Sequence, residues 1–204
     1  MTETFDRAYW ENRYGAAGLA WSGRPNAVLV TEVSALAPGR ALDIGSGEGG
    51  DAIWLAERGW TVTGTDISQN ALDKASARAA SMGVTIDWWQ HDLSEWMPEP
   101  ASFDLVTSHF MHLPVSLRTR LYAALAGAVA PGGTLLVVGH DPAALEGHDH
   151  RLELMFTVDD VLADIEGQGL RVEVAESRPR SQVAADGTVT PMSDIVVRAQ
   201  RTHS

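Results

Sequence analysis

The sequence predicts an α/β fold in which a mostly parallel sheet is covered by helices on both faces. From residue 40 onwards, short apolar segments of strand character alternate with helical patterns. Strands separated by helices pair in parallel through right-handed crossovers. The last two strand segments, 170–177 and 194–200, have only a loop containing Asp186 and Gly187 between them. We therefore expect them to pair antiparallel, with one reversed strand near the sheet edge.

The size of the chain indicates a single domain. It has 204 residues, of which 45% are hydrophobic, enough for one compact core. We expect one domain over residues 1–204, with N-terminal helices in residues 1–36 and the core sheet in residues 37–204.

Each element is placed by its start and stop signals. An amphipathic pattern predicts a helix over residues 6–16, and Pro25 suits the first turn of a second helix that ends at Pro38-Gly39. Ser68 is a typical N-cap, while Gly59 and Gly83 end helices. The expected strands are 40–44, 60–66, 84–89, 103–108 and 134–139, with a turn at 131–133. The expected later helices are 51–58, 69–82, 114–129 and 158–167.

Composition argues against several classes of partner. The net charge is −12, which repels nucleic acid and anionic membrane surfaces at long range. There is no cysteine, so disulfides and thiolate chemistry are excluded, and a reducing cytoplasm fits.

The residues from Met1 to Asp6 lack signal-peptide features, and the longest apolar run, 121–130, is shorter than the roughly 20 residues that cross a bilayer. We expect a soluble cytoplasmic protein.

A glycine-rich loop lies between the first strand and the next helix. Residues 41–50 read ALDIGSGEGG, and small residues let a backbone approach a ligand closely. The following helix N-terminus attracts anionic groups. Gly45, Gly47 and Gly50 also fit the G-x-G-x-x-G pattern of dinucleotide sites. Alone, this pattern is equally typical of a tight structural turn.

Three carboxylates follow successive strands. Asp43 precedes the glycine loop, where it would meet a ligand ammonium group, and Asp66 ends the next strand roughly 20 residues later, where an acid accepts ribose hydroxyls. Asp92 follows the third strand and is placed to accept from an adenine amino group, with Ile67 and Leu93 on either side of the ring. Each aspartate alone is more typical of a turn or helix cap. Three in succession favour one shared ligand.

In this order, the segments resemble the class I methyltransferases that use S-adenosylmethionine (SAM). The matching segments are LDIGSGEG at 42–49, VTGTDIS at 62–68, HDL at 91–93, FDLV at 103–106 and PGGTL at 131–135. The resemblance covers about residues 36 to 140. It implies a Rossmann-like, doubly wound sheet of seven strands in the order 3-2-1-4-5-7-6 with the last strand antiparallel. It also implies SAM as cosubstrate, with Gly45, Ser46, Gly47 and Gly49 in its binding loop.

The N-terminal segment adds a finer resemblance. Residues 9–14 (YWENRY) and 21–23 (WSG) are similar to the lid of small-molecule methyltransferases of the tellurite-resistance and thiopurine type. The resemblance implies that Tyr14 and Trp21 close over the methionine part of SAM, because a sulfonium beside aromatic rings gains cation–π attraction. The alternative is that these rings only pack the N-terminal helices on the sheet.

Histidines are the candidates for chemistry after the fourth and fifth strands. Residues 108–112 read SHFMH, in place of the Asn-Pro-Pro-Tyr type of segment in methylases of adenine or glutamine nitrogen, which argues against those substrates. We expect His109 beside SAM and His112 or His140 as a base, if the acceptor needs one. The alternative for each is a polar loop residue without a catalytic role.

A metal site is the weaker interpretation of the histidines. His140-Asp141 and the 148–150 segment (HDH) carry zinc-binding side chains, but no third ligand follows at helical spacing. We predict no metal, and expect this region to be a loop over the acceptor pocket, where specificity resides.

The preferred function is methyl transfer from SAM to a small-molecule acceptor, with S-adenosylhomocysteine (SAH) as product. The acceptor is left open among thiols or chalcogens, phenols or other hydroxyls, and amines. An NAD(P)-dependent oxidoreductase is the first alternative, although no Tyr-x-x-x-Lys pair follows the loop. A SAM-binding protein without turnover is the second. A monomer and a homodimer both remain open.

Overall fold

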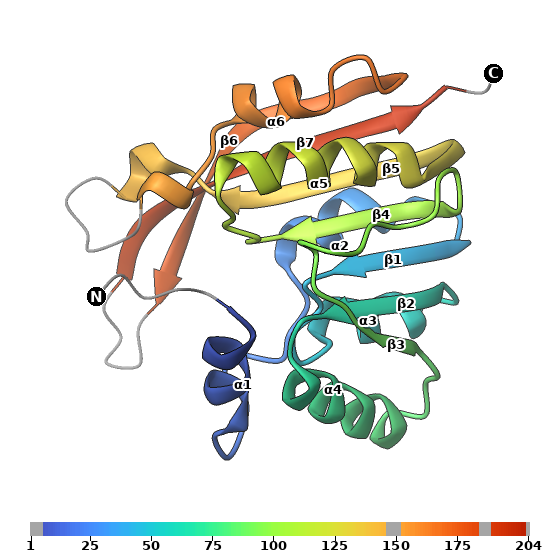
Figure 1. Cartoon of the computed structure of the whole chain (residues 1–204), viewed down its shortest axis with the longest axis vertical. Helices are drawn as coiled ribbons and strands as arrows, with labels where there is room; N and C mark the ends of the chain where they lie inside the picture. Colours follow the sequence, from blue (N-terminus) through green and yellow to red (C-terminus); the bar gives the residue numbers. More distant parts are fainter. Residues whose placement is uncertain (1–5, 146–151, 184–188, 203–204) are drawn as a thin grey trace. The chain divides into compact units, whose positions relative to one another are not determined.

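The fold is the Rossmann-like α/β arrangement that the sequence predicts. The structure, a computed structural model, describes residues 6–145, 152–183 and 189–202 (Figure 1). The helices are α1 (Arg7–Gly15), α2 (Ala27–Val33), α3 (Gly50–Ala56), α4 (Gln69–Ser81), α5 (Val115–Ala128) and α6 (Val158–Asp164), with short 3-10 turns η1 (Pro142–Leu145) and η2 (Leu152–Leu154). The strands are β1 (Arg40–Ile44), β2 (Thr61–Asp66), β3 (Asp87–Gln90), β4 (Phe103–His109), β5 (Val129–His140), β6 (Leu170–Val183) and β7 (Val189–Arg201). They form a seven-stranded sheet in the order β3-β2-β1-β4-β5-β7-β6, so the predicted order is confirmed.

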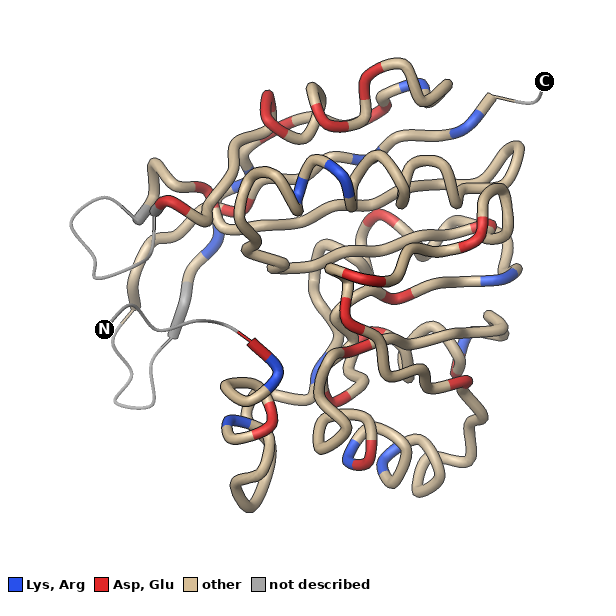
Figure 2. Tube along the Cα trace, viewed as in Figure 1, with Lys and Arg blue, Asp and Glu red and all other residues tan. Residues whose placement is uncertain are grey.

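Internal contacts divide the chain into two compact units, which are described separately. Unit 1 comprises residues 1–97 and 103–107, and unit 2 comprises residues 98–102 and 108–204. The single-domain organisation therefore stays a prediction. No helix in the described ranges combines the length and the apolar character that crossing a membrane requires. Acidic positions outnumber basic ones along the trace in Figure 2, as the net charge of −12 requires.

Unit 1 is built on three parallel strands. β1 pairs with β2 and β2 pairs with β3 in the same direction, so their carboxyl ends share one edge of the sheet. The apolar faces of α3 and α4 are buried, with Leu55 and Ala71 fully covered. Ser68 caps α4 as predicted, because its hydroxyl accepts from the Ala71 N–H at 3.2 Å. These strand ends are therefore held in a fixed register by a packed core.

Two boundaries in unit 1 differ from the sequence prediction. α2 begins at Ala27, because the Asn26 side chain accepts from the Val28 N–H at 2.8 Å and acts as the N-cap in place of Pro25. β3 begins at Asp87, three residues later than expected. The Val84 N–H still bonds the Ala79 carbonyl, so that residue completes the end of α4 before the strand starts.

Unit 2 contains the antiparallel strands. β7 pairs antiparallel with both β5 and β6, which confirms the reversed strand. β6 and β7 are longer than predicted, and pair from Leu170↔Arg201 to Val183↔Val189, whereas β7 pairs with β5 only from Asp194 onwards. The two strands therefore continue as a ribbon beyond the end of β5 (Figure 1). Pro179 is tolerated because β6 is the outermost strand. The Asp186-Gly187 loop lies outside the described residues.

The expected turn at residues 131–133 is wrong. β5 begins at Val129 and runs through Pro131, Gly132 and Gly133 without a break in the strand. Gly132 has a φ of 79°, so a local irregularity is absorbed within the strand. α6 is shorter than expected, since it ends at Asp164.

The core of unit 2 contains a buried ion pair. Arg118 on α5 donates through Nε to the Asp164 carboxylate at 2.7 Å, and both side chains are 5% exposed. The Thr119 hydroxyl donates to the same carboxylate at 2.6 Å. Buried charges are tolerated only when each has a partner, so this pair fixes α6 against α5.

We expect the Arg118→Met substitution to lower the free energy of unfolding by about 3–5 kcal/mol, since it leaves a buried carboxylate without its cation. Urea denaturation followed by circular dichroism measures the loss. The double variant Arg118→Met/Asp164→Leu serves as the control and is expected to regain most of the stability, because no unpaired charge remains. A loss below about 1 kcal/mol in the single variant would contradict the assignment.

Candidate functional site

The glycine loop leaves β1 and enters α3 with a backbone that suits glycine. Gly45, Gly47 and Gly49 have φ values of 69°, 51° and 78°, in the left-handed region that side chains with a Cβ rarely adopt. The Gly45 and Ser46 N–H groups both donate to the Thr65 carbonyl, at 2.8 and 3.0 Å. The loop is therefore folded back on the end of β2, the strand next to β1.

The Trp88 ring of β3 leaves no space for a side chain at two neighbouring positions, which are both glycine. A Cβ on Gly64 would lie 2.5 Å from the Trp88 ring, and a Cβ on Gly49 would lie 2.9 Å from it. The Gly49 Cβ would also lie 3.0 Å from Ala75 of α4. Small residues at these positions therefore let the loop, the indole and α4 approach closely.

Asp66 joins the glycine loop to the end of β2. Its carboxylate accepts from the Gly47 N–H and from the Ser68 N–H, each at 2.9 Å. Desolvation by burial raises the pKa of Asp66, although the backbone N–H groups of Ser68, Gly47 and Ile67 act in the opposite direction. Burial therefore disfavours the ionised form of Asp66, and further hydrogen bonds to its carboxylate would stabilise that form.

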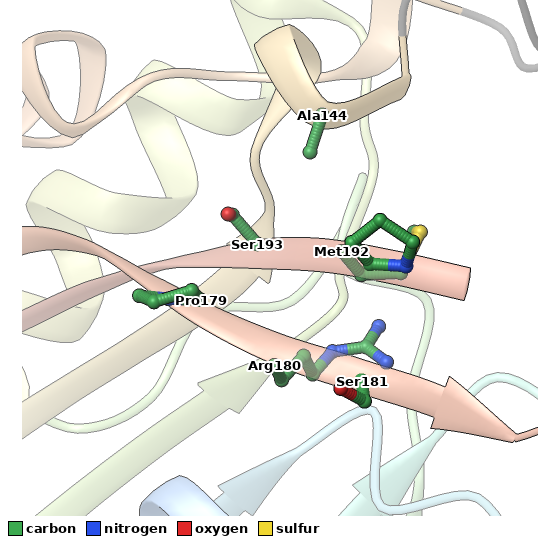
Figure 3. Close-up of a pocket in the computed structure, with 7 residues that line it drawn as sticks. Ala144, Pro179, Arg180, Ser181, Met192 and Ser193 are labelled. Atoms are coloured by element: carbon green, nitrogen blue, oxygen red, sulfur yellow. The ribbon is translucent and has the colours of Figure 1, made fainter. Parts of the chain in front are cut away.

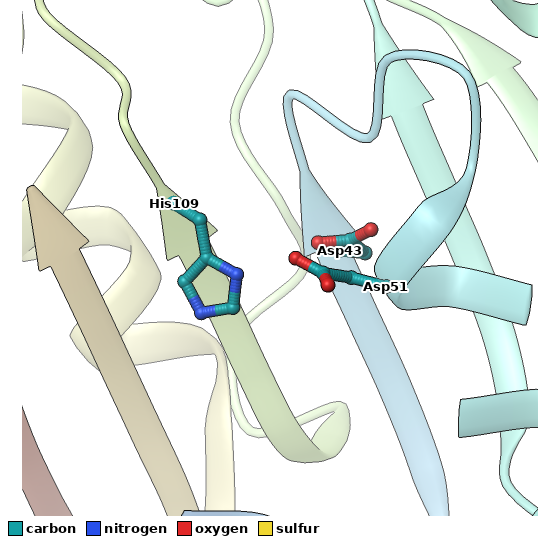
Figure 4. Close-up of side chains that lie close together, drawn as sticks. All are labelled: Asp43, Asp51 and His109. Atoms are coloured by element: carbon teal, nitrogen blue, oxygen red, sulfur yellow. The ribbon is translucent and has the colours of Figure 1, made fainter. Parts of the chain in front are cut away.

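Asp43 and Asp51 place a second pair of carboxylates near the loop. Asp43 lies at the end of β1 and accepts from the Thr107 hydroxyl at 2.9 Å, while Asp51 in the first turn of α3 accepts from the Asn26 N–H at 2.6 Å. Carboxylate oxygens of the two lie within 4.8 Å of one another, and Figure 4 shows both side chains at the mouth of the loop. This region is strongly negative.

Asp92 lies in a turn after β3. Its carboxylate accepts from the Ser94 N–H at 2.8 Å, and the hydroxyl and N–H of Ser94 hold the pKa of Asp92 below its usual range. Ile67 and Leu93 are both half-buried, and the Ile67 carbonyl accepts from the Gln90 side chain at 3.2 Å. The turn that sequence reasoning left as the alternative for Asp92 is therefore present.

An aromatic cluster that the sequence did not reveal lies beside this turn. His91 stacks on Trp96 with ring centroids 4.3 Å apart and planes 1° apart, and Trp89 meets both rings edge-on. Desolvation by burial lowers the pKa of His91, so a neutral, aromatic surface follows β3.

The two predicted lid aromatics contact one another. The Trp21 indole N–H donates to the Tyr14 hydroxyl at 3.0 Å, and a Cβ on Gly47 would lie 3.0 Å from that hydroxyl. Burial, reinforced by the charge of Asp66, raises the pKa of Tyr14 to about 12, so its proton is retained at neutral pH. Trp21 is 54% exposed, and Arg13 lies over its ring at 4.5 Å. Tyr14 thus lies against the glycine loop, with Trp21 at the surface.

Glu48 of the glycine loop holds the segment at residues 16–23. Its buried carboxylate accepts from the N–H groups of Ala20, at 2.9 Å, and Trp21, at 3.2 Å, and pairs with Lys74 of α4 at 3.3 Å. The Lys74 ammonium also donates to the Ala16 carbonyl at 2.8 Å and the Gly18 carbonyl at 2.6 Å. No sequence signal assigns Glu48 this role, because its partners are main-chain atoms 27 and 28 residues away.

Two further contacts hold the N-terminal region on α4. Arg78 donates to the Gly23 carbonyl at 2.7 Å and also to the Glu48 carbonyl. Glu11 of α1 accepts from the Ser68 hydroxyl and from the Gln69 and Asn70 N–H groups, at 2.8 to 3.1 Å. Desolvation would raise the pKa of Glu11, but these hydrogen bonds lower it overall.

The predicted histidines lie in unit 2. His140 ends β5, and its Nδ1 lies 3.2 Å from the Asp194 carboxylate of β7, which also accepts from Arg180 Nε at 2.6 Å. The His112 ring stacks 5.2 Å from the His140 ring. His109 is the last residue of β4 and is half-buried (Figure 4). Sequence reasoning found the histidines but missed Asp194 and Arg180, because the hairpin register is not readable from the sequence.

A surface pocket lies beside this group. It is lined by η1 and by the extended part of β6 and β7, with Arg180, Met192 and Ser193 among its walls (Figure 3). Arg180 therefore belongs both to the pocket and to the group around Asp194. The 148–150 segment, which carried the metal alternative, lies outside the described residues.

The comparisons with known proteins agree with this geometry. A family model described as a methyltransferase domain matches residues 41–133, from β1 to β5. Over these residues the chain is similar to the class I SAM-dependent methyltransferases. The match covers the glycine loop, both acidic strand ends and the strand that carries His109.

Individual relatives extend the comparison. The chain is 34% identical to 2-heptyl-1-hydroxyquinolin-4(1H)-one methyltransferase of Mycobacteroides abscessus over 52% of this chain and 48% of that protein. It is 26% identical to thiocyanate methyltransferase 1 of Brassica oleracea over 92% and 84% of the two chains. Among solved structures, one titled for the conversion of a disulfide bond into a thioacetal group in echinomycin biosynthesis covers 100% of this chain and 93% of that chain, at a TM-score of 0.74 and 23% identity.

The extent of these matches limits what they show. The chain spans about half the length of the first curated relatives it matches. The solved structure shares the fold, and at 23% identity it shows the fold alone. The similarity to the methyltransferase family therefore rests on the 41–133 match, whereas the reaction and its acceptor are taken up as proposals below.

We expect the Glu48→Gln substitution to release the segment at residues 16–23. Each charge-assisted hydrogen bond is worth about 1.5–3 kcal/mol, so amide exchange at Ala20 and Trp21 is expected to accelerate roughly 10- to 100-fold. Hydrogen–deuterium exchange with mass spectrometry measures this. Glu57→Gln, at the exposed C-cap of α3, is the matched control. Unchanged exchange in the Glu48 variant would show that Glu48 does not anchor the segment.

Proposed function

We propose that the protein transfers a methyl group from SAM to a small-molecule acceptor. The observation that carries the proposal is the junction at Asp66, where a buried carboxylate is hydrogen-bonded to the glycine loop and ends the strand next to β1. A ligand with two vicinal hydroxyls fits there. The nucleoside part of SAM supplies such a pair on its ribose.

The hydrogen-bonding capacity of Asp66 supports this ligand. Each carboxylate oxygen has two lone pairs, and the Gly47 and Ser68 N–H groups use one on each oxygen. The Ile67 N–H also acts on the carboxylate, so one of the four acceptor positions is left for a ribose hydroxyl. That added donor would also stabilise the charged form, which burial disfavours.

Buried hydroxyl groups in the same unit support a polar ligand. Among the described residues, the side-chain oxygens of Ser46 and Thr65 are buried and have no hydrogen-bond partner. Buried polar groups rarely stay unsatisfied in a finished site. The polar groups of a bound ligand would satisfy these hydroxyls. In the free protein, water would occupy the same positions.

The charge of the site suits a cationic ligand. Asp43 and Asp51 lie at the loop mouth, and SAM carries an ammonium group and a sulfonium. We propose that Asp43 faces the ammonium group, that Trp21 and Tyr14 cover the methionine part, and that Ile67, Asp92 and Leu93 receive the adenine. A sulfonium near an aromatic ring is stabilised by the quadrupole of the ring.

The chemistry demands mainly orientation. When bound, SAM would supply an activated methyl group. The sulfur that carries it is positively charged and becomes neutral when the methyl group leaves. The chain's own residues hold the cosubstrate, exclude water through the segment at residues 16–23, and align the acceptor for in-line displacement. A base is needed only where the acceptor keeps its proton near neutral pH.

The relatives support a small acceptor. One is named for a hydroxyquinolinone and one for thiocyanate, so oxygen- and sulfur-bearing acceptors occur among similar proteins. The net charge of −12 disfavours nucleic acid. The acceptor atom, the oligomeric state and a cytoplasmic location remain predictions from the sequence.

The NAD(P) alternative is weaker on the same observations. A dinucleotide places pyrophosphate on the glycine loop, and the carboxylates of Asp43 and Asp51 at the loop mouth would repel it. The family match also favours SAM.

We expect SAM and SAH to raise the melting temperature of the protein, and NAD to leave it unchanged, because only a ligand of the native state stabilises it. Asp66→Asn is expected to weaken SAM binding about 10- to 100-fold, through the loss of a charge-assisted hydrogen bond. Differential scanning fluorimetry and isothermal titration calorimetry measure both effects. Stabilisation by NAD alone would refute the proposal, and tight SAM binding without SAH formation from any thiol, phenol or amine would favour a binding protein without turnover.

SAM affinity is expected to fall as the pH is lowered from 7 to 5. Burial raises the pKa of Asp66 above its ordinary value of 3.8, so a proton competes with the ribose hydroxyls at a higher pH than it would at an exposed aspartate. Calorimetric titrations at several pH values measure the slope. The slope is expected to disappear in Asp66→Asn, and an equal slope in both proteins would assign the effect to another group.

A further inference from the structure

The surface pocket in unit 2 lies on the part of the β6–β7 ribbon that continues beyond the end of β5. Its walls come from β6, β7 and the short turn η1, and all of the residues that line it belong to unit 2 (Figure 3). Its volume of about 480 Å³ is within the range of pockets that hold small molecules. The pocket can therefore be considered as a binding site within this unit alone.

The pocket combines apolar walls with one charged group. Pro179, Pro191 and Met192 supply the apolar surface, and Arg180 is the charged side chain among the described residues that line it. In the register of the two strands, Arg180 lies directly opposite Met192. An apolar lining with a few polar groups that fix the orientation of the ligand is typical of small-molecule sites.

A buried carboxylate holds Arg180 in place. Arg180 Nε donates to Asp194 Oδ2 at 2.6 Å, and the Asp194 side chain is 5% exposed. The other oxygen of Asp194 lies 3.2 Å from His140 Nδ1, and the His140 ring lies 4.5 Å from the Phe110 ring. The guanidinium is therefore already oriented, so that a ligand would not have to order a mobile arginine.

The remaining hydrogen-bond donors of Arg180 are available to a ligand. A guanidinium has five N–H donors and no acceptor. Within the described ranges, this guanidinium contacts Asp194 through Nε and His140, whose Nδ1 lies 3.4 Å from Nη2. Both N–H groups of Nη1 and at least one of Nη2 are therefore left. The Arg180 side chain is 33% exposed and lines the pocket, so these donors can be reached from solution.

Neighbouring carboxylates have partners of their own. Glu176 of β6 pairs with Arg178 at 2.7 Å. Asp141, which follows β5, accepts from the Ala143 N–H at 2.9 Å and from the Ser177 hydroxyl. These contacts leave the exposed edge of the guanidinium in the pocket to an anion from solution.

A small molecule fits this pocket better than an added peptide strand. Pro179 and Pro191 have no N–H, so neither can donate a hydrogen bond to a third strand at these positions. In the register of the ribbon, Pro179 pairs with Ser193 and Pro191 pairs with Ser181. Each proline in the pocket therefore has a serine, with its short hydroxyl group, directly opposite.

We propose that this pocket binds a small organic carboxylate with an apolar body. The carboxylate accepts from Nη1 and Nη2 of Arg180 as a planar bidentate pair, the geometry that a guanidinium favours. The two prolines and Met192 contact the apolar body. The proposal goes beyond the proposed function and does not rest on it, because these residues belong to unit 2 and the residues proposed to bind SAM belong to unit 1.

Benzoate and its neutral counterpart benzamide test the proposal in the full chain. Isothermal titration calorimetry is expected to show saturable binding of one benzoate per chain. Benzamide is expected to bind about 10-fold more weakly or worse, because the charge-assisted bidentate contact is lost. The absence of saturable benzoate binding, equal affinity for the two probes, or inorganic phosphate binding as tightly as benzoate would each overturn the assignment to a carboxylate.

Variants of Arg180 separate its role from that of the apolar walls. Arg180→Gln is expected to lower the affinity for benzoate about 10-fold or more and to change that for benzamide less than about twofold. Arg180→Lys keeps the charge without the planar fork, so an intermediate loss is expected. Arg178→Gln, on the same strand, is the matched control and is expected to stay within about twofold of the wild type. Benzoate affinity that Arg180→Gln leaves unchanged would contradict the proposal.

A measurement on the unsubstituted chain remains decisive if the Arg180 variants fold poorly, since they leave the buried Asp194 carboxylate without its cation. Proton–nitrogen-15 NMR is expected to show benzoate-induced shifts at the Arg180 Nε–H and at the amides of residues 180–181 and 192–193. Saturable binding that leaves the Arg180 Nε–H signal unmoved would overturn the proposal. SAM titrated separately tests the proposed function, because its failure would remove SAM binding and leave benzoate binding intact.

Discussion

The hydrogen bond from the Gly47 N–H to the Asp66 carboxylate is the constraint on which unit 1 depends. It joins the loop after β1 to the end of β2, and it is possible only because Gly47 adopts a left-handed conformation. The same loop presents Glu48 to the segment at residues 16–23 and Gly49 to Trp88. One backbone conformation therefore sets the positions of the Asp66 carboxylate, the N-terminal segment and the third strand.

The elements around the glycine loop were predictable because they depend on local signals, whereas the strand order was implied by the resemblance to a known family. Alternating strand and helix patterns, the glycines after β1 and the Ser68 cap all act within a few residues of their own position. The N-cap at Asn26 and the strand character of residues 131–133 were not predictable, because a side-chain hydrogen bond and cross-strand pairing decide them. The long β6–β7 ribbon likewise depends on pairing between distant residues.

The residues of the candidate site likewise fall into those that the sequence indicated and those that it did not. Asp43, Asp66 and Tyr14 could be named from strand ends and from family resemblance, whereas Glu48 and Asp194 could not. The partners of Glu48 include main-chain N–H groups, and His140, the partner of Asp194, is 54 residues away in a β5–β7 register that one extra residue would change. Acidic residues of this kind look like solvated surface positions until the fold brings their partners to them.

The anchoring of residues 16–23 has a consequence for variation and design. Lys74 and Arg78 bind the carbonyl oxygens of this segment, and Glu48 binds its N–H groups. Since main-chain atoms make these contacts, most side chains of the segment are not needed to keep it in place; only Gly18 and Gly23, with φ values of 81° and 67°, are restricted by their backbone. The segment can therefore exchange side chains while its path is preserved, so substitutions there are expected to alter the surface of unit 1 without changing its backbone.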